Sequence, residues 1–230
     1  MEYAILFLPL IGSLIGYLGR STTKYFAEIS TSLFVSISAV LSILVFWNGI
    51  QNDSYGNYKI FEWISSGGFT ANWSIKIDPL SSIMLVVVTF VSALVHIYSI
   101  GYMSHDPHKP RFMSYLSLFT FSMLALVVSD NFLQLFFGWE GVGLCSYLLI
   151  GFWYKKETAN NAAIKAFIVN RIGDFGLAIA IFLIFFFFGT INFEETFKAT
   201  SQFAEKKIIF FGFEANLITL ICVFLFIGAM

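Results

Sequence analysis

Long runs of apolar residues, separated by shorter polar stretches, make up most of the chain. A helix of about 20 apolar residues spans the hydrocarbon core of a bilayer, which is about 30 Å thick. The pattern predicts membrane helices at Tyr3–Leu18, Phe26–Trp47, Pro79–Ile100, Phe112–Val128, Phe132–Tyr154 and Ala162–Phe188, and a seventh that begins near Asn216. The seventh run stops at Met230 after about 15 residues, too few to cross alone. We therefore expect an N-terminal fragment that ends inside a helix.

Two connections between these runs are long enough to hold structure of their own. The first, Asn48–Asp78, alternates polar and aromatic residues around Trp63 and Trp73, which predicts a short surface hairpin. It ends at Asp78-Pro79, where an acidic N-cap and a proline at the first helical position favour a helix start. The second, residues 190–215, is charged and amphipathic, and we expect it to be a connecting segment outside the membrane.

Among the short connections, basic residues lie on one side only, which predicts the orientation in the membrane; the two long connections are mixed in charge and count for less. The short connections after the first, third and fifth runs carry Arg20 and Lys24, Lys109 and Arg111, and Lys155 and Lys156. Basic loops stay on the cytoplasmic or matrix side, so we expect the N-terminus on the opposite side. The predicted location is the bacterial inner (plasma) membrane or, alternatively, the mitochondrial inner membrane.

Composition supports an all-α, polytopic transmembrane bundle and excludes several other classes. The 230 residues are 58% hydrophobic and 12% charged, a balance that a soluble domain of this size could not bury. A net charge of −1 gives no sign of nucleic-acid binding. The two cysteines, Cys145 and Cys222, lie in apolar runs and are interpreted as small buried residues. Phosphate loops, zinc-ligand spacings and Ser/His/Asp sets are missing from the sequence, so we expect no metal, redox centre or hydrolytic site in this chain.

The fifth run contains a single ionisable residue, Glu140, as its ninth residue. An acidic side chain at the centre of a membrane helix costs about 2.5–3.5 kcal/mol, so it needs a partner, water or a proton. Glycines at positions 138, 141, 143 and 151 would let neighbouring helices approach its backbone closely. Intramembrane carboxylates of this kind usually mark an ion or proton path.

The sixth run adds Lys165, Arg171 and Asp174. Arg171 and Asp174 are three residues apart and therefore share one helix face. Counted from opposite ends of the two antiparallel runs, Asp174 lies roughly 18 Å deep and Glu140 roughly 13 Å deep, so both carboxylates come near the same level of the core. Asn170 is expected to add a buried hydrogen-bonding group nearby.

Such a set of charges suits proton handling. Low dielectric surroundings favour a neutral carboxylic acid, whereas a neighbouring cation favours the carboxylate. A change in the distance between Glu140 and its cation would therefore load or unload a proton. The alternative is that these charges only neutralise one another and fix helix register. We favour the proton-handling interpretation because the residues lie in adjacent runs at similar depth.

Other polar residues give weaker signals. His96 is interpreted as a hydrogen-bonded core or interface histidine rather than a ligand. His105 and His108 flank Asp106, but the surrounding prolines and basic residues favour a solvated turn over a metal site. Asp130 is interpreted as a turn residue, with a proton entrance as the alternative.

The segments LFTFSMLALVVSDNFLQLFFGWEGVGLCSYLLIGFWY and ANNAAIKAFIVNRIGDFG carry a family resemblance. They resemble the antiporter-like subunit L of respiratory complex I, the proton-pumping NADH:quinone oxidoreductase, and its mitochondrial counterpart, NADH dehydrogenase subunit five. The start MEYAILFLPLIGSLIGYLGR and the stretch IDPLSSIML are also similar to this family, so the likeness covers the whole chain. The resemblance implies N-terminal helices over 1–111 and, over 112–230, the first part of the first of two inverted five-helix repeats.

The resemblance also implies roles and partners. Glu140 matches the family's essential fifth-helix glutamate, and Lys165, Arg171 and Asp174 match its charged set in the sixth helix. The family's pumping lysine follows a GA-x-G-K-S pattern, and this sequence stops at Gly228-Ala229-Met230, so we expect that these residues alone do not pump. FMN, iron–sulfur clusters and quinone are expected in partner subunits, and the expected contacts are other complex I membrane subunits, lipid and protons. The alternatives are a subunit of a multisubunit sodium/proton antiporter and a purely structural membrane scaffold.

Overall fold

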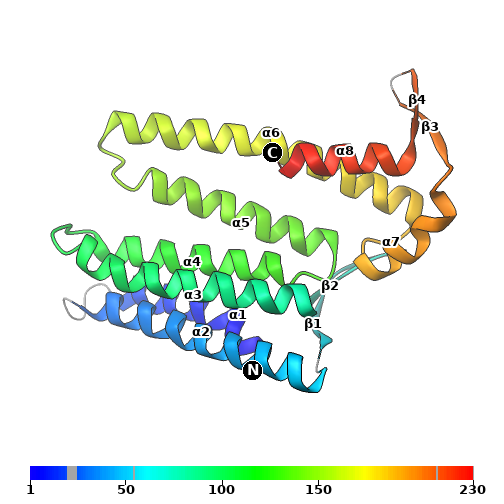
Figure 1. Ribbon diagram of the computed structural model, residues 1–230. Helices are drawn as coiled ribbons and strands as arrows, with labels where there is room; N and C mark the ends of the chain where they lie inside the picture. Colours follow the sequence, from blue (N-terminus) through cyan, green and yellow to red (C-terminus); the bar gives the residue numbers. More distant parts are fainter. Residues whose placement is uncertain (20–24, 54, 211, 230) are drawn as a thin grey trace.

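Long helices lie side by side in the computed structural model, which describes residues 1–19, 25–53, 55–210 and 212–229. They are α1 (Glu2–Leu18), α2 (Phe26–Asn52), α3 (Pro79–Tyr102), α4 (Lys109–Val127), α5 (Phe132–Ile150), α6 (Glu157–Phe188) and α8 (Leu217–Ala229) (Figure 1). Within the described residues, α2 to α6 are long and apolar enough to cross a membrane, while α1 and α8 are shorter apolar helices. The predicted helical membrane bundle is confirmed. Arg20 and Lys24, used in predicting its orientation, lie outside the described residues.

Several helices begin or end at residues other than those predicted, because the helical backbone does not stop where the apolar run stops. The second helix continues to Asn52, five residues into the predicted loop. The fifth ends at Ile150, because Gly151–Tyr154 form turns although they are apolar. The sixth begins at Glu157 rather than Ala162, which gives 32 residues and a length of about 48 Å. This helix is longer than the hydrocarbon core, so at least one end extends beyond it.

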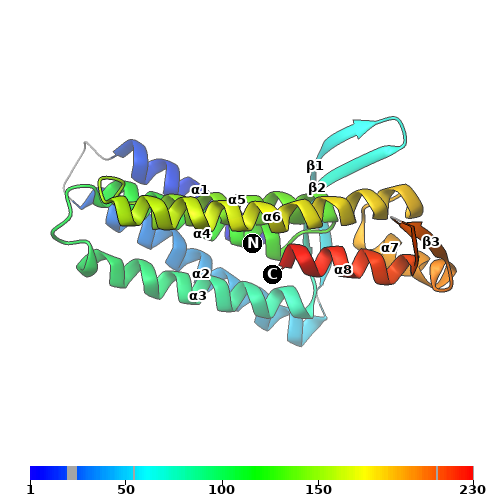
Figure 2. The same cartoon turned by 90° about the horizontal axis from the view of Figure 1, so that it is seen from above.

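Two antiparallel hairpins lie at the end of the bundle opposite the α3–α4 and α5–α6 connections (Figures 1 and 2). The predicted first hairpin is confirmed, with β1 (Gly56–Ser66) paired to β2 (Phe69–Ile77) across a turn in which Gly67 has φ +58°. Residues 190–215 contain α7 (Phe193–Ala199), the short 3₁₀ helix η2 (Thr200–Phe203), and a second hairpin of β3 (Lys207–Phe210) and β4 (Phe213–Asn216).

Hydroxyl groups join the helices of the N-terminal bundle, α1 to α4, in its interior. Ser38 Oγ donates to the Ile5 carbonyl of α1 at 2.8 Å, and Ser42 Oγ lies 2.7 Å from Thr89 Oγ1 of α3. Ser117 Oγ of α4 donates at 2.7 Å to the Pro9 carbonyl. Pro9 has no N–H, so the Ile5 carbonyl one turn earlier lacks its helical donor and accepts the Ser38 hydroxyl instead. The second helix, which is rich in serine, therefore packs against its neighbours through hydroxyl groups.

Buried amides attach the first hairpin and the α7 segment to the start of α5. Gln134 is fully buried and bonds both the N–H and the carbonyl of Ser74 in β2, at 3.0 and 2.7 Å. Asn131 caps α5 through its side chain and donates to a carbonyl of β2. Asn192 is the residue before α7, and its Nδ2 donates to the Asp130 carboxylate at 2.9 Å. This set, the amide clamp (Asp130, Asn131, Gln134, Asn192), fixes the start of α5.

Polar and aromatic contacts close the opposite end, here called the basic end because Lys109, Arg111, Lys155 and Lys156 lie there. Arg111 donates to the Phe152 carbonyl at 2.9 Å, and Trp153 Nε1 donates to Asp106 at 2.9 Å. Partial burial would raise the pKa of Asp106, but hydrogen bonds from Trp153 and the His108 N–H, with nearby positive charge, lower it below its ordinary value. These contacts tie the α3–α4 connection to the α5–α6 turns.

Candidate functional site

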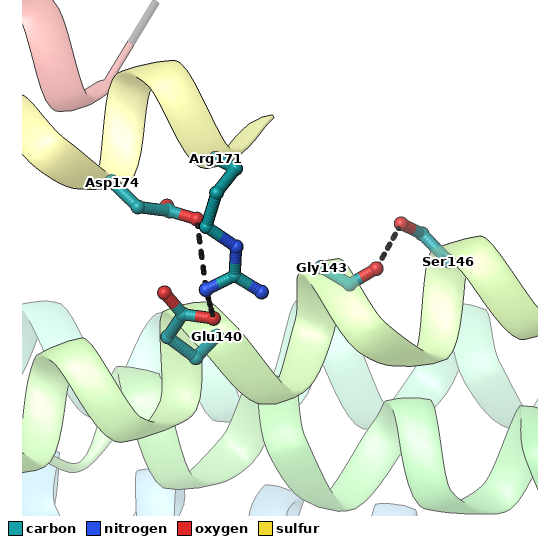
Figure 3. Close-up of polar contacts among 5 residues, drawn as sticks. All are labelled: Glu140, Gly143, Ser146, Arg171 and Asp174. Carbon is teal, nitrogen blue, oxygen red and sulfur yellow. Dashed lines mark hydrogen bonds and ion pairs between the residues drawn. The ribbon is translucent and has the colours of Figure 1, made fainter. Parts of the chain in front are cut away.

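Close contact between α4 and α5 sets the position of Glu140. A methyl group built on Gly138 would lie 2.6 Å from the backbone nitrogen of Leu126, so only glycine fits this approach without a shift. One turn along, Gly141 packs against the Ser122 hydroxyl. With this side of α5 held against α4, Glu140 projects from the side that faces α6 (Figure 3).

Arg171 lies between two carboxylates, as Figure 3 shows. Its Nη1 forms an ion pair and hydrogen bond with Glu140 of α5, and the same nitrogen lies 3.6 Å from Asp174 Oδ2 on its own helix. The predicted Arg171–Asp174 pair, three residues apart, is confirmed. The expected common level of the two carboxylates is confirmed too, because one guanidinium contacts both. We call these three residues the charge triad.

The members of the charge triad differ in burial. The Asp174 side chain is 8% exposed, that of Glu140 is 23% exposed and that of Arg171 is 49% exposed. Asp174 Oδ1 is buried and, within the described residues, accepts no hydrogen bond. The guanidinium also lies over the Phe167 ring, 4.8 Å from its centroid. Arg171 is thus shared by two carboxylates and is half-exposed. Its guanidinium can therefore shift from one carboxylate toward the other.

Other residues of the predicted set lie apart from the triad. Lys165 is exposed, and in the part of the chain that the structure describes it has no hydrogen bond or ion pair. Asn170 is exposed as well, so the prediction of a buried hydrogen-bonding group there is wrong. Asn170 nevertheless faces α5, because its Nδ2 would lie 3.8 Å from a methyl group built on Gly143.

The burial of the other polar residues and cysteines considered in the sequence agrees with the predictions at all but one position. His96 is fully buried, as predicted. Asp130 follows α4 in a turn, also as predicted, and is buried within the amide clamp. Cys145 is buried, but Cys222 is exposed, so the prediction for the second cysteine is wrong. Across the described ranges, no three His, Cys, Asp or Glu side chains gather in a way that could hold a metal ion.

A second ion pair, between Glu28 of α2 and Lys109 of α4, was not predicted. The Lys109 Nζ lies 3.1 Å from Glu28 Oε1. The lysine side chain is only 10% exposed and the glutamate side chain only 3% exposed. Glu28 is the acidic residue inside the predicted span Phe26–Trp47, and that was the available signal. Lys109 was counted as a loop cation, and nothing in the linear sequence places it against Glu28.

Two family models match the chain. The one described as NADH-ubiquinone oxidoreductase (complex I), chain 5 N-terminus, matches residues 63–113. The one described as NADH:quinone oxidoreductase/Mrp antiporter, TM, matches residues 129–230, which include the whole charge triad.

Relatives and solved structures agree with these matches. NADH-quinone oxidoreductase subunit L of Rickettsia bellii is 50% identical over 98% of this chain and 35% of its own length. NADH-ubiquinone oxidoreductase chain 5 of Triticum aestivum is 52% identical over 100% of this chain and 34% of its own length. The chain thus spans about a third of the length of these curated relatives. A chain of the Mrp complex from a Dietzia species shares the fold, with a TM-score of 0.80 at 22% identity over 99% of this chain and 23% of that one.

Proposed function

The chain belongs to the family of antiporter-like complex I membrane subunits, subunit L and chain 5, and from this premise we propose that it translocates protons within an NADH:quinone oxidoreductase. It is an integral membrane protein, with apolar helices long enough to cross a bilayer. The observation that carries the proposal is the charge triad, in which Arg171 joins Glu140 of one membrane helix to Asp174 of the next.

Sharing one cation between two carboxylates gives a means of moving a proton. An arginine stays protonated under all physiological conditions, so the triad changes charge only at its acids. A carboxylate beside a cation keeps its charge, whereas one left alone in low-dielectric surroundings takes up a proton. When Arg171 moves from Glu140 toward Asp174, which is already 3.6 Å away, Glu140 becomes the group that binds the proton. The reverse movement releases it.

Lys165 is included in the proposal as a relay or tuning residue outside the triad. It lies on the same helix, six residues before Arg171 and about 9 Å toward the basic end. A cation at that place repels protons, so it adjusts the electrostatic potential along α6.

The energy for this movement must come from other subunits. Relatives of this chain are named as subunits of an NADH-quinone oxidoreductase. In the proposal, FMN, iron–sulfur clusters and quinone belong to partner subunits, and their redox chemistry reaches this chain as an electrostatic or conformational signal through neighbouring membrane subunits. The role of the residues described here is to bind, hold and release the proton.

The test is Glu140→Gln in the full-length protein, assembled in its membrane complex. Glutamine keeps the size of the side chain and its hydrogen bonds but cannot carry a proton. We expect normal assembly and loss of NADH-driven proton pumping in membrane vesicles. The matched control is Glu62→Gln, which removes an exposed acid of the first hairpin and should leave pumping unchanged.

Other outcomes would decide for the alternatives. Assembly with undiminished pumping in Glu140→Gln would favour a structural scaffold and overturn the proposal. Proton movement driven by a sodium gradient in the absence of NADH and quinone would favour a sodium/proton antiporter subunit. The fold alone does not separate these cases, because a chain of an Mrp complex shares it.

A further inference from the structure

Three buried polar groups of α2 and α3 have no hydrogen-bond partner among the described residues. They are both carboxylate oxygens of Glu28, the hydroxyl of Ser32 and Nε2 of His96. Their residues are 2%, 7% and 0% exposed. A polar atom that is removed from water and left unbonded is costly, so such atoms normally bond to internal water. Three of them in one bundle require an explanation.

Helix register brings the three groups to one region. The Ser42–Thr89 bond, at 2.7 Å, fixes how α2 and α3 run past each other in opposite directions. One turn closer to the basic end, Val35 and Ala39 of α2 pack with Ala93 of α3. Each helix then presents a polar residue one turn further on, which is Ser32 on α2 and His96 on α3. Glu28 precedes Ser32 by four residues, so it lies on the same face of α2, one turn nearer the basic end.

The carboxylate of Glu28 lies deepest toward the basic end, next to its cation. Lys109 Nζ is 3.1 Å from one carboxylate oxygen and lies 5.6 Å from the centroid of the Tyr25 ring. The other ionisable groups described at this end include Arg111 of α4, Lys155 and Lys156 of the α5–α6 turns, and those of the α3–α4 connection. Asp106 there is bonded to Trp153 and the His108 N–H, and His105 lies in the same exposed turn. Of the described ionisable groups, Glu28, Lys109 and His96 are the buried ones that α2, α3 and α4 contribute near this end.

Hydroxyl groups continue from His96 toward α4. Nδ1 of His96 lies 2.8 Å from the Ser92 carbonyl and 3.3 Å from the Ser92 hydroxyl. That hydroxyl is 2.5 Å from Thr120 Oγ1 of α4. The imidazole therefore has one nitrogen in a protein hydrogen-bond chain and the other, Nε2, free to bond to water.

We propose that α2, α3 and α4 enclose a water-binding, proton-exchanging site formed by Glu28, Ser32 and His96, with Lys109 as its fixed counter-charge. Internal water bonds the unpartnered oxygen, hydroxyl and imidazole nitrogen and connects them. A hydronium ion that enters from the basic end gives its proton to the Glu28 carboxylate, which becomes a neutral acid, and leaves as water. Transfer through the bridging water to Nε2 of His96 restores the carboxylate and makes the ring an imidazolium.

This site is distinct from the charge triad and is tested separately from it. Infrared difference spectra of the intact membrane complex, recorded across a pH titration, report protonated carboxyl groups through their C=O stretching band. We expect a band that shifts in heavy water, disappears in Glu28→Gln and moves in Glu28→Asp. Glu62→Gln, at an exposed hairpin position, is the control and should retain the band. Glu140→Gln should retain the Glu28 band whether or not it abolishes pumping, so the two proposals fail independently.

A second measurement needs no variant and detects the water itself. Met113 lies one turn after Lys109 in α4 and is 0% exposed. Hydroxyl radicals formed by radiolysis of bound water oxidise neighbouring thioethers, so we expect Met113 to be oxidised in the assembled complex despite its burial. An unmodified Met113 would mean a dry site, and identical infrared spectra of wild type and Glu28→Gln would mean that Glu28 never binds a proton. Either result overturns the proposal.

Discussion

Two ion pairs in this molecule have opposite designs. Glu28 and Lys109 form a pair of one acid and one base, and both side chains are almost completely buried between helices. Glu140, Arg171 and Asp174 form a set of two acids and one base, and the base is half-exposed. A single buried pair cannot change partners, whereas a shared, accessible cation can. The difference teaches that one acid and one base keep each other as partners, and that a second acid lets a shared cation move between two sites.

The largest effect on stability should come from breaking the buried pair. Lys109→Met leaves the Glu28 carboxylate without its cation, and loss of one partner of a buried pair typically costs about 3–5 kcal/mol. We expect a lower unfolding midpoint for the protein in mild detergent, measured by circular dichroism during heating. The control is Lys156→Met, which removes an exposed cation that lies over the Trp153 ring and should change the midpoint little. Equal midpoints for the two variants would contradict the contrast between buried and exposed charges.

A smaller effect should follow from forcing α5 away from α4. In Gly138→Ala the new methyl group meets the Leu126 backbone at 2.6 Å, and overpacking of this kind costs about 1–3 kcal/mol. The shift also moves Glu140 relative to Arg171, so pumping should fall together with stability. Gly141→Ala is the matched variant, because there the nearest atom is the Ser122 hydroxyl at 2.8 Å, which can rotate away. A Gly141→Ala defect as large as that of Gly138→Ala would show that the close backbone approach is not what positions the triad.

Removing the shared cation should affect function more than stability. The Arg171 side chain is 49% exposed, so Arg171→Gln should cost at most about 1 kcal/mol of folding free energy. Pumping should fall about 5- to 150-fold, the usual size of an energetic coupling between two sites. Arg171→Lys keeps the charge without the planar fork and should retain part of the activity. The comparison between the ion pairs would fail if Arg171→Gln destabilised the protein as much as Lys109→Met.

The smallest effect concerns Asp106 at the basic end. Its pKa is lowered in the folded chain, so its hydrogen bonds stabilise the fold fully above the ordinary value of 3.8. That contribution is lost as the pH falls below 3.8 through the lowered folded pKa. Because the group is mostly exposed, we expect a change below about 1 kcal/mol, visible as a shift in Trp153 fluorescence on acidification. Asp106→Asn should remove that pH dependence, and a persisting shift would assign it to another group.

Hydropathy, capping and residue spacing were enough to predict the helices, the first hairpin and the contact within α6. The run lengths placed α2 to α6, and Asp78 caps α3 through the predicted N-cap side chain, with Ser81 completing a capping box. Depth counting from opposite ends brought Glu140 and Asp174 to one level, because antiparallel helices of known rise leave little freedom.

The remaining features depend on how helices rotate and slide against each other, which a linear pattern does not encode. Glu28 and Lys109 are separated by two helices and a hairpin in sequence, so only the packed bundle makes them partners. Helix packing likewise leaves Lys165 and Asn170 of α6 and Cys222 of α8 exposed, which their positions in apolar runs did not indicate. Hydropathy also misplaced the end of α5. Residues 151–154 are mostly apolar, but they form turns and the helix stops at Ile150.

The amide clamp holds the N-terminal end of α5 in place, so that end acts as a pivot. Gln134 and Asn131 bind that end to the hairpin strand, whereas the far end leads into turns. Any swing of the helix must therefore pivot near Phe132, and displacement grows with distance from the pivot. Glu140 lies about 12 Å along this lever, so each degree of swing carries its backbone about 0.2 Å. A swing of a few degrees, transmitted through the turns that Arg111 and Asp106 hold at the basic end, would thus be enough to open or close the contact with Arg171.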